Sequence, residues 1–241
     1  MTPIPALPAC CTPLDAHWPL PDVLPGTVLI GTHFNPLNLR ADDFQRSLVE
    51  VPASIQRSVA KRQAEFLAGR VCARAALLQL EGSSVIPPIG DDRAPIWPPH
   101  ISGSITHSTG RAAAIVAHKR DWRGLGMDLE NLLDAERAER LAGEILNPPE
   151  LQRMAAGRRD DLALCVTLTF SVKESLFKAL YPIVQQRFYF EHAEVLEWNR
   201  QGRVRLRLLI DLSNEWRHGT ELEAQFSVAD GQVLSLVSIK A

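Results

Sequence analysis

The sequence predicts an α+β fold built from two similar α/β subdomains. Apolar residues recur at helical spacing over residues 54–80, and basic and apolar residues alternate over residues 203–208 as in a half-buried strand. Asp230-Gly231 between two apolar runs is typical of a hairpin turn. The predicted elements follow the order strand, helix, strands and then strand, helices, strands. This order suggests a duplication, although no residue-level repeat accompanies it.

We place the junction of the two halves near residues 118–123, which predicts an N-terminal half of residues 1–120 and a C-terminal half of residues 121–241. The chain has 241 residues, of which 46% are hydrophobic. This length suits one large domain or two small ones, and the composition allows a sizeable core.

The N-terminal half begins with a proline-rich segment, residues 1–26, which we interpret as an extended arm on the surface. Residues 82–100 are also rich in proline and predict a loop. The regular elements are expected at 28–34 (strand), 54–80 (helix), 101–107 (strand) and 111–117 (strand), with a turn at 108–110.

The C-terminal half begins with a predicted strand at residues 124–130. Asn147 ahead of Pro148-Pro149 is a helix-start signal, because a capping side chain is followed by prolines at positions where no N–H is needed. Further elements are expected at 162–180 (helix), 203–208 (strand), 222–228 (strand) and 232–239 (strand).

Composition excludes several classes of protein. A net charge of −2 is unfavourable for nonspecific binding to nucleic acid. The four cysteines form no Cys-x-x-Cys pair, so we expect free thiols in a reducing compartment. Residues 1–11 contain no basic residue, unlike a secretory signal, and no apolar run approaches the ~18 residues of a membrane span. We therefore expect a cytoplasmic protein with no membrane span.

The first chemical signal is the pair Asp128 and Glu130. Side chains alternate along a strand, so these two carboxylates share one face while Leu129 points to the other. Two such carboxylates repel each other unless water or a cation screens them, and oxygen ligands suit Mg²⁺. An acidic pair that is merely solvated at a strand end is the simpler interpretation of this motif alone.

The second signal is the helical segment 170–180. Glu174 and Lys178 lie one turn apart on the same face, and Lys173 is adjacent. A carboxylate that completes a metal site beside two lysines would suit phosphoryl transfer. The alternative is an ordinary i,i+4 ion pair. Phe170, among others, is expected to face the core.

Two further segments carry groups that bind phosphate. Residues 101–108 combine hydroxyls, a glycine and His107 at a strand end, where N–H groups and hydroxyls can hold a phosphate. Arg62 and Arg70 lie on one face of the predicted helix, and Arg93 lies in the following loop. Arginines bind phosphate bidentately, although a turn histidine and a solvated basic face are the simpler alternatives.

Together these motifs resemble one family. Segments 61–70 (KRQAEFLAGR), 104–107 (SITH), 126–130 (GMDLE) and 170–178 (FSVKESLFK) look like the signatures of phosphopantetheinyl transferases, in family order. Within that family the chain looks like the enterobactin synthetase component D group of the Sfp-type class, and Trp97-Pro98 supports that placement. The resemblance covers residues 55–181.

The resemblance implies a pseudo-twofold fold with coenzyme A in the cleft between the halves. It implies Mg²⁺ held at Asp128, Glu130 and Glu174, and it places His107 at the 3′-phosphate of coenzyme A, beside Thr106. The remaining positions match nucleotide contacts at Arg62, Arg70 and Arg93, and pyrophosphate contacts at Lys173 and Lys178. The sequence departs from many relatives at Phe170, where they have Trp, and at Thr106, where they have Ser.

The implied reaction transfers phosphopantetheine from coenzyme A to a serine of an apo carrier protein and releases 3′,5′-ADP. Glu174, directly or through a metal-bound water, would take the serine proton, and Lys178 would neutralise developing charge. A monomer acting on acyl or peptidyl carriers, in siderophore or fatty acid synthesis, is expected. Rival hypotheses are a Mg²⁺-dependent phosphohydrolase or nucleotidyl transferase, and a coenzyme A or carrier-binding module without catalysis.

Overall fold

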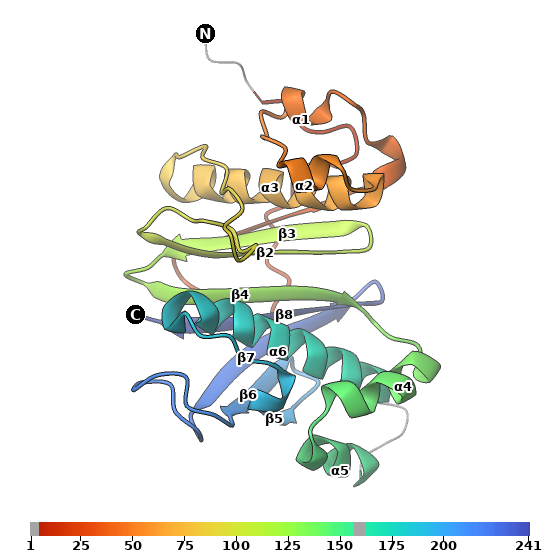
Figure 1. Ribbon diagram of the computed structural model, residues 1–241, viewed down its shortest axis with the longest axis vertical. Coiled ribbons are helices and arrows are strands. Elements are labelled where there is room, and N and C mark those ends of the chain that lie inside the picture. The colour runs from red at the N-terminus through yellow and green to blue at the C-terminus, as the bar shows by residue number, and fades with distance from the viewer. Residues whose placement is uncertain (1–4, 157–161) are drawn as a thin grey trace. The chain divides into compact units, whose positions relative to one another are not determined.

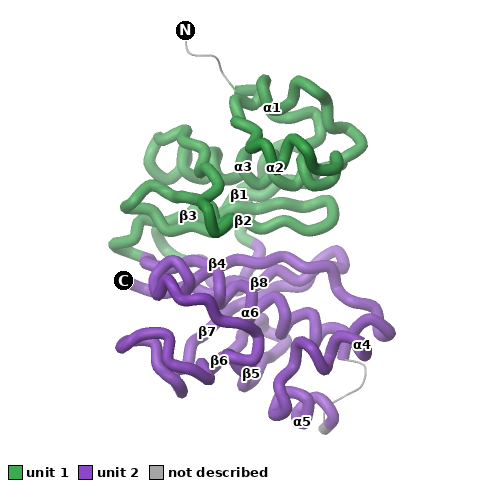
Figure 2. Tube along the Cα trace, viewed as in Figure 1, with its two compact units in different colours: residues 1–18, 24–121 green, residues 19–23, 122–241 purple. Residues whose placement is uncertain are grey.

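The computed structural model describes residues 5–156 and 162–241, and it divides the chain into two compact units (Figures 1 and 2). Residues 1–18 and 24–121 form the first unit, and residues 19–23 and 122–241 form the second. Residues 1–4 of the predicted N-terminal arm lie outside the described residues.

The first unit is a three-stranded antiparallel sheet with a long helix packed on it. The strand order is β1-β3-β2. Apolar residues of the helix, including Ala73 and Leu77, pack against Ile30 and Val116 of the sheet. Its elements are β1 (Thr27–His33), η1 (Pro36–Asn38), α1 (Asp43–Arg46), α2 (Ala53–Gln56), α3 (Ala60–Glu81), β2 (Ile101–Ser108) and β3 (Arg111–His118).

The second unit is a five-stranded antiparallel sheet in the order β4-β8-β7-β6-β5, with a buried helix packed on it. Leu176 and Leu180 of this helix share a core with Leu206 and Val237 of the sheet. Its elements are β4 (Trp122–Asn131), α4 (Ala135–Ile145), α5 (Pro148–Ala156), α6 (Leu162–Val184), η3 (Phe190–His192), β5 (Ala193–Trp198), β6 (Arg203–Leu208), β7 (Glu221–Ala229) and β8 (Gln232–Lys240).

One predicted hairpin turn and one predicted helix start are confirmed in detail. Asp230 and Gly231 both have positive φ, at 52° and 71°, as a two-residue hairpin between β7 and β8 requires. The side chain of Asn147 accepts a hydrogen bond from the Glu150 backbone N–H at 3.1 Å, and Glu150 Oε2 accepts from the Asn147 N–H at 2.8 Å. This reciprocal capping box begins α5.

The predicted helix over 54–80 is wrong at its start. The segment forms two helices, because Val59 adopts an extended conformation and ends the continuity between α2 and α3. The side-chain amide of Gln63 donates a hydrogen bond to the Ser58 carbonyl at 2.8 Å and so stabilises the break. Helix α4 and strand β5 are elements that the sequence patterns did not predict.

The N-terminal arm carries no helix or named strand in its described part, but it does not lie wholly on the surface. Cys10 and Leu20 are buried, and isolated β-bridges join Cys11 to Phe34 and Asp15 to Gly31. The arm is therefore tied to β1 by backbone hydrogen bonds and contributes to the core, which corrects the expectation of a surface segment.

Candidate active site

The close approach of α6 to β4 positions the acidic residues. Residues 124, 126, 128 and 130 alternate onto one face of β4. A Cβ atom at Gly126 would collide with the Ser175 carbonyl oxygen of α6, and one at Gly124 would lie 2.6 Å from the Ala179 oxygen. The two glycines therefore let the helix backbone lie directly on this face. Asp128 and Glu130 continue the same face toward α6.

Lys178 bridges from the helix to the strand. Its Nζ donates to Asp128 Oδ1 at 2.6 Å and to the Met127 carbonyl at 3.2 Å. The simple alternative, an i,i+4 ion pair between Glu174 and Lys178, is not what the lysine forms in the described part of the chain. The lysine remains partly exposed, so its charge is available to a ligand.

Burial and the neighbouring Asp128 carboxylate raise the pKa values of Glu130 and Glu174. Burial, followed by the charge of Asp128, raises the pKa of Glu130 to about 7 against the opposing effect of Lys178. Burial also raises the pKa of Glu174, with Lys178 opposing and Asp128 reinforcing the shift. Asp128 is buried, and its Oδ2 has no hydrogen-bond partner among the described residues.

These features fit a divalent cation. A buried carboxylate oxygen without a partner, beside two carboxylates whose charged forms are disfavoured, is the environment that a hard cation with oxygen ligands relieves. The described structure does not bring one oxygen of each carboxylate within 4.8 Å of the others. A bound ion would therefore require at least one of these side chains to move inward.

Glu174 also lines a cavity of about 250 Å³ in the second unit. Phe177, Phe188 and Phe190 form part of its wall, and Arg187 adds a positive charge. Glu174 therefore lies at the edge of the core, beside a cavity. Phe177 packs against Phe188 at 5.3 Å between ring centroids, which makes this wall rigid.

Lys173 faces a different environment from Lys178. Its side chain is 1% exposed, and its Nζ donates to Glu150 Oε2 at 2.8 Å and to the Ile145 carbonyl at 3.1 Å. Burial lowers the pKa of Lys173, and the Glu150 carboxylate opposes that shift. The structure thus places Lys173 in an internal ion pair, apart from the contacts of Lys178.

In the first unit, the end of β2 meets the face of α3. Arg62 Nη1 lies 2.9 Å from His107 Nε2 and 3.5 Å from Glu65 Oε2, while His107 Nδ1 lies 3.8 Å from the same oxygen. The sequence motif contained Glu65, but its position facing His107 was not predicted. The adjacent Thr106 is buried on β2.

Arg70 and Arg93 lie in contrasting settings. Arg70 is buried, its guanidinium stacks on Phe66 at 4.8 Å, and its Nε has no partner among the described residues. Burial and the charge of Arg62 lower the pKa of Arg70 to about 10. Arg93 is exposed in a turn with a positive φ of 71°, where its N–H donates to the Gly90 carbonyl. No described contact joins Arg93 to Arg62 or His107.

Comparison with known proteins decides the family. The model of the 4′-phosphopantetheinyl transferase N-terminal domain matches residues 50–117, and that of the 4′-phosphopantetheinyl transferase superfamily matches residues 124–237. The chain belongs to the 4′-phosphopantetheinyl transferase superfamily.

Relatives of the transferase that carry names support the family assignment. Enterobactin synthase component D of Escherichia coli O157:H7 is 36% identical over 179 residues, covering 73% of this chain and 81% of the relative. The 4′-phosphopantetheinyl transferase Svp of Streptomyces mobaraensis is 34% identical over 199 residues, or 80% and 78% of the two chains. Npt of Nocardia iowensis is 37% identical over 142 residues, or 58% and 62%.

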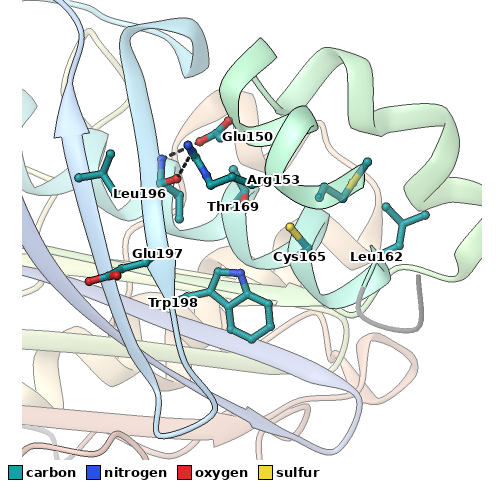
Figure 3. Close-up of a pocket in the computed structure, with 10 residues that line it drawn as sticks. Glu150, Arg153, Leu162, Cys165, Thr169, Leu196, Glu197 and Trp198 are labelled. Carbon is teal, nitrogen blue, oxygen red and sulfur yellow. Dashed lines mark hydrogen bonds between the residues drawn. The ribbon is translucent and has the colours of Figure 1, made fainter. Parts of the chain in front are cut away.

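A second cavity of the transferase, of about 300 Å³, lies where α5, α6 and β5 meet (Figure 3). None of the three acidic residues lines it. Glu150 and Arg153 hydrogen-bond to the Val195 backbone at its edge, and Arg153 also pairs with Glu194 at 2.9 Å.

None of the helices in the described part of the transferase has the length and apolar character needed to cross a bilayer.

Proposed function

We propose that this transferase moves the 4′-phosphopantetheine of coenzyme A onto a serine of an apo carrier protein and releases 3′,5′-ADP. The observation that carries the proposal is the contact of Lys178 with Asp128, beside two carboxylates whose pKa values are raised. A cation, an acid–base group and a divalent-ion site are the components that phosphoryl transfer needs. The superfamily supplies the identity of the transferred group.

We assign Mg²⁺ to Asp128, Glu130 and Glu174. The unpartnered Oδ2 of Asp128 and the raised pKa of Glu130 support this assignment, because both are relieved when a cation binds. When bound, Mg²⁺ would neutralise charge on the pyrophosphate of coenzyme A.

Glu174 is assigned to accept the proton of the carrier serine. A hydroxyl is a weak nucleophile at neutral pH and must lose its proton as it attacks the β-phosphate. Burial raises the pKa of Glu174 and makes its carboxylate a stronger base than an exposed one. Glu174 lines a cavity, and we assign this cavity as the route by which the serine approaches.

Lys178 is assigned to the negative charge that grows on the phosphate oxygens as the bond to 3′,5′-ADP breaks. Asp128 orients the ammonium through the 2.6 Å contact, and the Met127 carbonyl accepts a second hydrogen bond. A cation fixed before the reaction does not need to reorganise during it, which is the source of its catalytic effect. Lys173 is excluded from this assignment because it pairs with Glu150.

The nucleotide of coenzyme A is assigned to the first unit. Arg62 Nη1 lies 2.9 Å from His107 Nε2, so a guanidinium and an imidazole lie together where they can donate hydrogen bonds to the 3′-phosphate. Arg70 is buried without an ion pair to a carboxylate in the described part of the chain, which favours an anionic ligand. Arg93 is assigned as a further contact to the nucleotide, and only the resemblance supports this assignment.

The carrier substrate, the compartment and the oligomeric state are parts of the same proposal. Relatives named enterobactin synthase component D favour a peptidyl carrier of siderophore synthesis, and an acyl carrier of fatty acid synthesis is the second candidate. Coenzyme A and apo carriers are cytoplasmic substrates, so we place the reaction in the cytoplasm. A monomer is part of the proposal, because the residues assigned to the reaction all lie in one chain.

The proposal is tested by incubating the full chain with Mg²⁺, coenzyme A and a panel of apo carriers, followed by intact-mass measurement of each carrier. A gain of one phosphopantetheine on at least one carrier is expected. A carrier whose acceptor serine is replaced by alanine is the control and should not change mass. Cleavage of coenzyme A with no carrier modified would instead favour a phosphohydrolase.

A further inference from the structure

We infer that Glu81, His100 and His118 form a binding site for a divalent transition-metal ion such as Zn²⁺. The site lies in the first unit and shares no residue with the three carboxylates of the candidate active site. Among the described residues, this is the trio of histidine, cysteine or acidic side chains whose ligand atoms all lie within 4.8 Å of one another.

The separations match a shared metal ion closely enough for small side-chain rotations to complete the site. His100 Nε2 lies 2.8 Å from Glu81 Oε2, and His118 Nδ1 lies 4.0 Å from the same oxygen. Ligands at about 2.0–2.1 Å from a tetrahedral Zn²⁺ are separated by roughly 3.3–3.4 Å. The two imidazoles are stacked with centroids 5.9 Å apart and planes 22° from parallel. One nitrogen of each ring lies within 4.0 Å of the same Glu81 oxygen.

Backbone hydrogen bonds hold the three residues in place. Glu81 is the last residue of α3, and the helix ends at Gly82 with a φ of 74°, whose N–H donates to the Leu78 carbonyl. His118 ends β3, and the Lys119 N–H donates to the His100 carbonyl at 2.8 Å. Glu81 and His118 therefore end regular elements, and His100 lies in the turn directly before β2.

The electrostatic setting favours a cation. The carboxyl end of a helix carries partial negative charge, and the last turn of α3 has no basic residue to offset it. The Glu81 carboxylate adds a full negative charge at the same point. Its side chain is 18% exposed and that of His118 is 24% exposed, while His100 is 60% exposed. An ion can thus enter past His100 and meet two less exposed ligands.

The donor set selects the metal. Imidazole nitrogens suit Zn²⁺, Cu²⁺, Ni²⁺ and Fe²⁺, whereas Mg²⁺ prefers oxygen ligands. The site should therefore discriminate against the ion assigned to Asp128, Glu130 and Glu174. Three protein ligands leave at least one coordination position for water or for a further ligand. Because the ion would tie α3 to the β2–β3 hairpin, its main effect would be to stabilise the first unit.

The test is a zinc titration of the metal-stripped full chain against a chromophoric chelator, under reducing conditions and with excess Mg²⁺. The parent is expected to retain one Zn²⁺, and His100→Ala and His118→Ala should each weaken its affinity by about tenfold or more. His218→Ala is the matched control, because His218 is an exposed histidine of the second unit. Asp128→Asn is a second control and should keep the zinc affinity of the parent.

Thermal melting gives an independent readout. Zn²⁺ should raise the Tm of the parent and of His218→Ala, and this increase should be lost in His100→Ala, whose exposed side chain can be removed without unfolding the chain. Equal zinc affinity in the parent and in both site variants would overturn the inference. So would a parent that gives all its Zn²⁺ to the chelator and shows no zinc-dependent Tm, since the trio would then be only a hydrogen-bonded cluster.

Discussion

The Nζ atom of Lys178 on α6 lies 2.6 Å from Oδ1 of Asp128 on β4. The lysine therefore reaches across the contact between helix and sheet, and does not pair with Glu174 along the helix. Gly124 and Gly126 make this contact possible, because any side chain at either position would push the helix away from the strand. The motifs around residues 126–130 and 170–178 are thus one structural unit, in which the strand supplies Asp128 and Glu130 and the helix supplies Glu174 and Lys178.

Asp128→Asn should abolish transfer while the chain remains folded. The amide has the size of the carboxylate and can still accept a hydrogen bond from Lys178, but it lacks the charge that holds a divalent ion. The measurement is steady-state transfer with varied Mg²⁺, together with circular dichroism. Glu223→Gln, at an exposed position of β7, is the control and should retain parental activity. Near-normal transfer by folded Asp128→Asn would contradict the metal assignment.

Replacement by methionine should affect the two lysines of α6 in different ways. Lys178→Met should act mainly on the rate of transfer, and Lys173→Met mainly on the stability of the fold. Lys178→Met should lower kcat by about 10²–10³, the usual effect of losing one electrostatic donor. Lys173→Met leaves the buried Glu150 without its cation and should cost about 3–5 kcal/mol of unfolding free energy. Urea unfolding and kcat per folded molecule separate the effects. The account fails if Lys173→Met is the variant with the larger loss of kcat.

Stability in EDTA should fall as pH rises toward about 7. Burial and Asp128 raise the pKa of Glu130 to about 7, so the folded state keeps a proton that the unfolded chain releases at its ordinary pKa near 4.5. Between these values the folded state binds more protons, and the free energy of unfolding decreases with pH before levelling off.

Mg²⁺ should reverse this dependence, because the ion binds the deprotonated carboxylates and stabilises the fold more as pH rises. Thermal melts with EDTA and with Mg²⁺, recorded from about pH 5 to 8, measure both effects. Glu130→Gln should flatten the EDTA profile. An equal gain from Mg²⁺ at both ends of the range would argue against a cation at Glu130.

Arg70→Met should leave the free protein as stable as the parent, because it removes a buried charge that has no carboxylate partner in the described structure. The same change should raise the KM for coenzyme A by about tenfold or more, since a charge-assisted phosphate contact is lost. Lys61→Met, at an exposed position of α3, is the control.

His107→Ala should raise the KM for coenzyme A more than the KM for its 3′-dephospho form. Unchanged KM values would remove these residues from the nucleotide site.

Most strands were predictable because their patterns are local. The alternation of residues 203–208 gives β6 its observed bounds, and the turn chemistry of Asp230-Gly231 defines the β7–β8 hairpin. The break at Val59 was not predictable, because apolar spacing continues across it and the interruption depends on backbone conformation and on the side chain of Gln63. Strand β5 pairs with β6 in a hairpin and was missed because a register shift between Val195 and Glu197 interrupts the regular alternation of its side chains.

The candidate site was predictable in residue type and only partly in arrangement. Strand alternation places Asp128 and Glu130 on one face, and the helical period places Glu174 and Lys178 one turn apart. Sequence spacing could not show that Lys173 turns inward, because its partner Glu150 lies 23 residues away and is held by the cap of α5. The reciprocal Asn147–Glu150 spacing was the one signal that could have located Glu150.

The central claim, that this chain transfers phosphopantetheine to a carrier serine, is tested most directly by counting products in one reaction. The quantity measured is 3′,5′-ADP released per carrier modified, with Mg²⁺ and coenzyme A in excess. The account predicts one 3′,5′-ADP per modified carrier, none with the serine-to-alanine carrier, and a severe loss of both products in Glu174→Gln. Release of 3′,5′-ADP at the same rate without a carrier serine, or full transfer by Glu174→Gln, would contradict it.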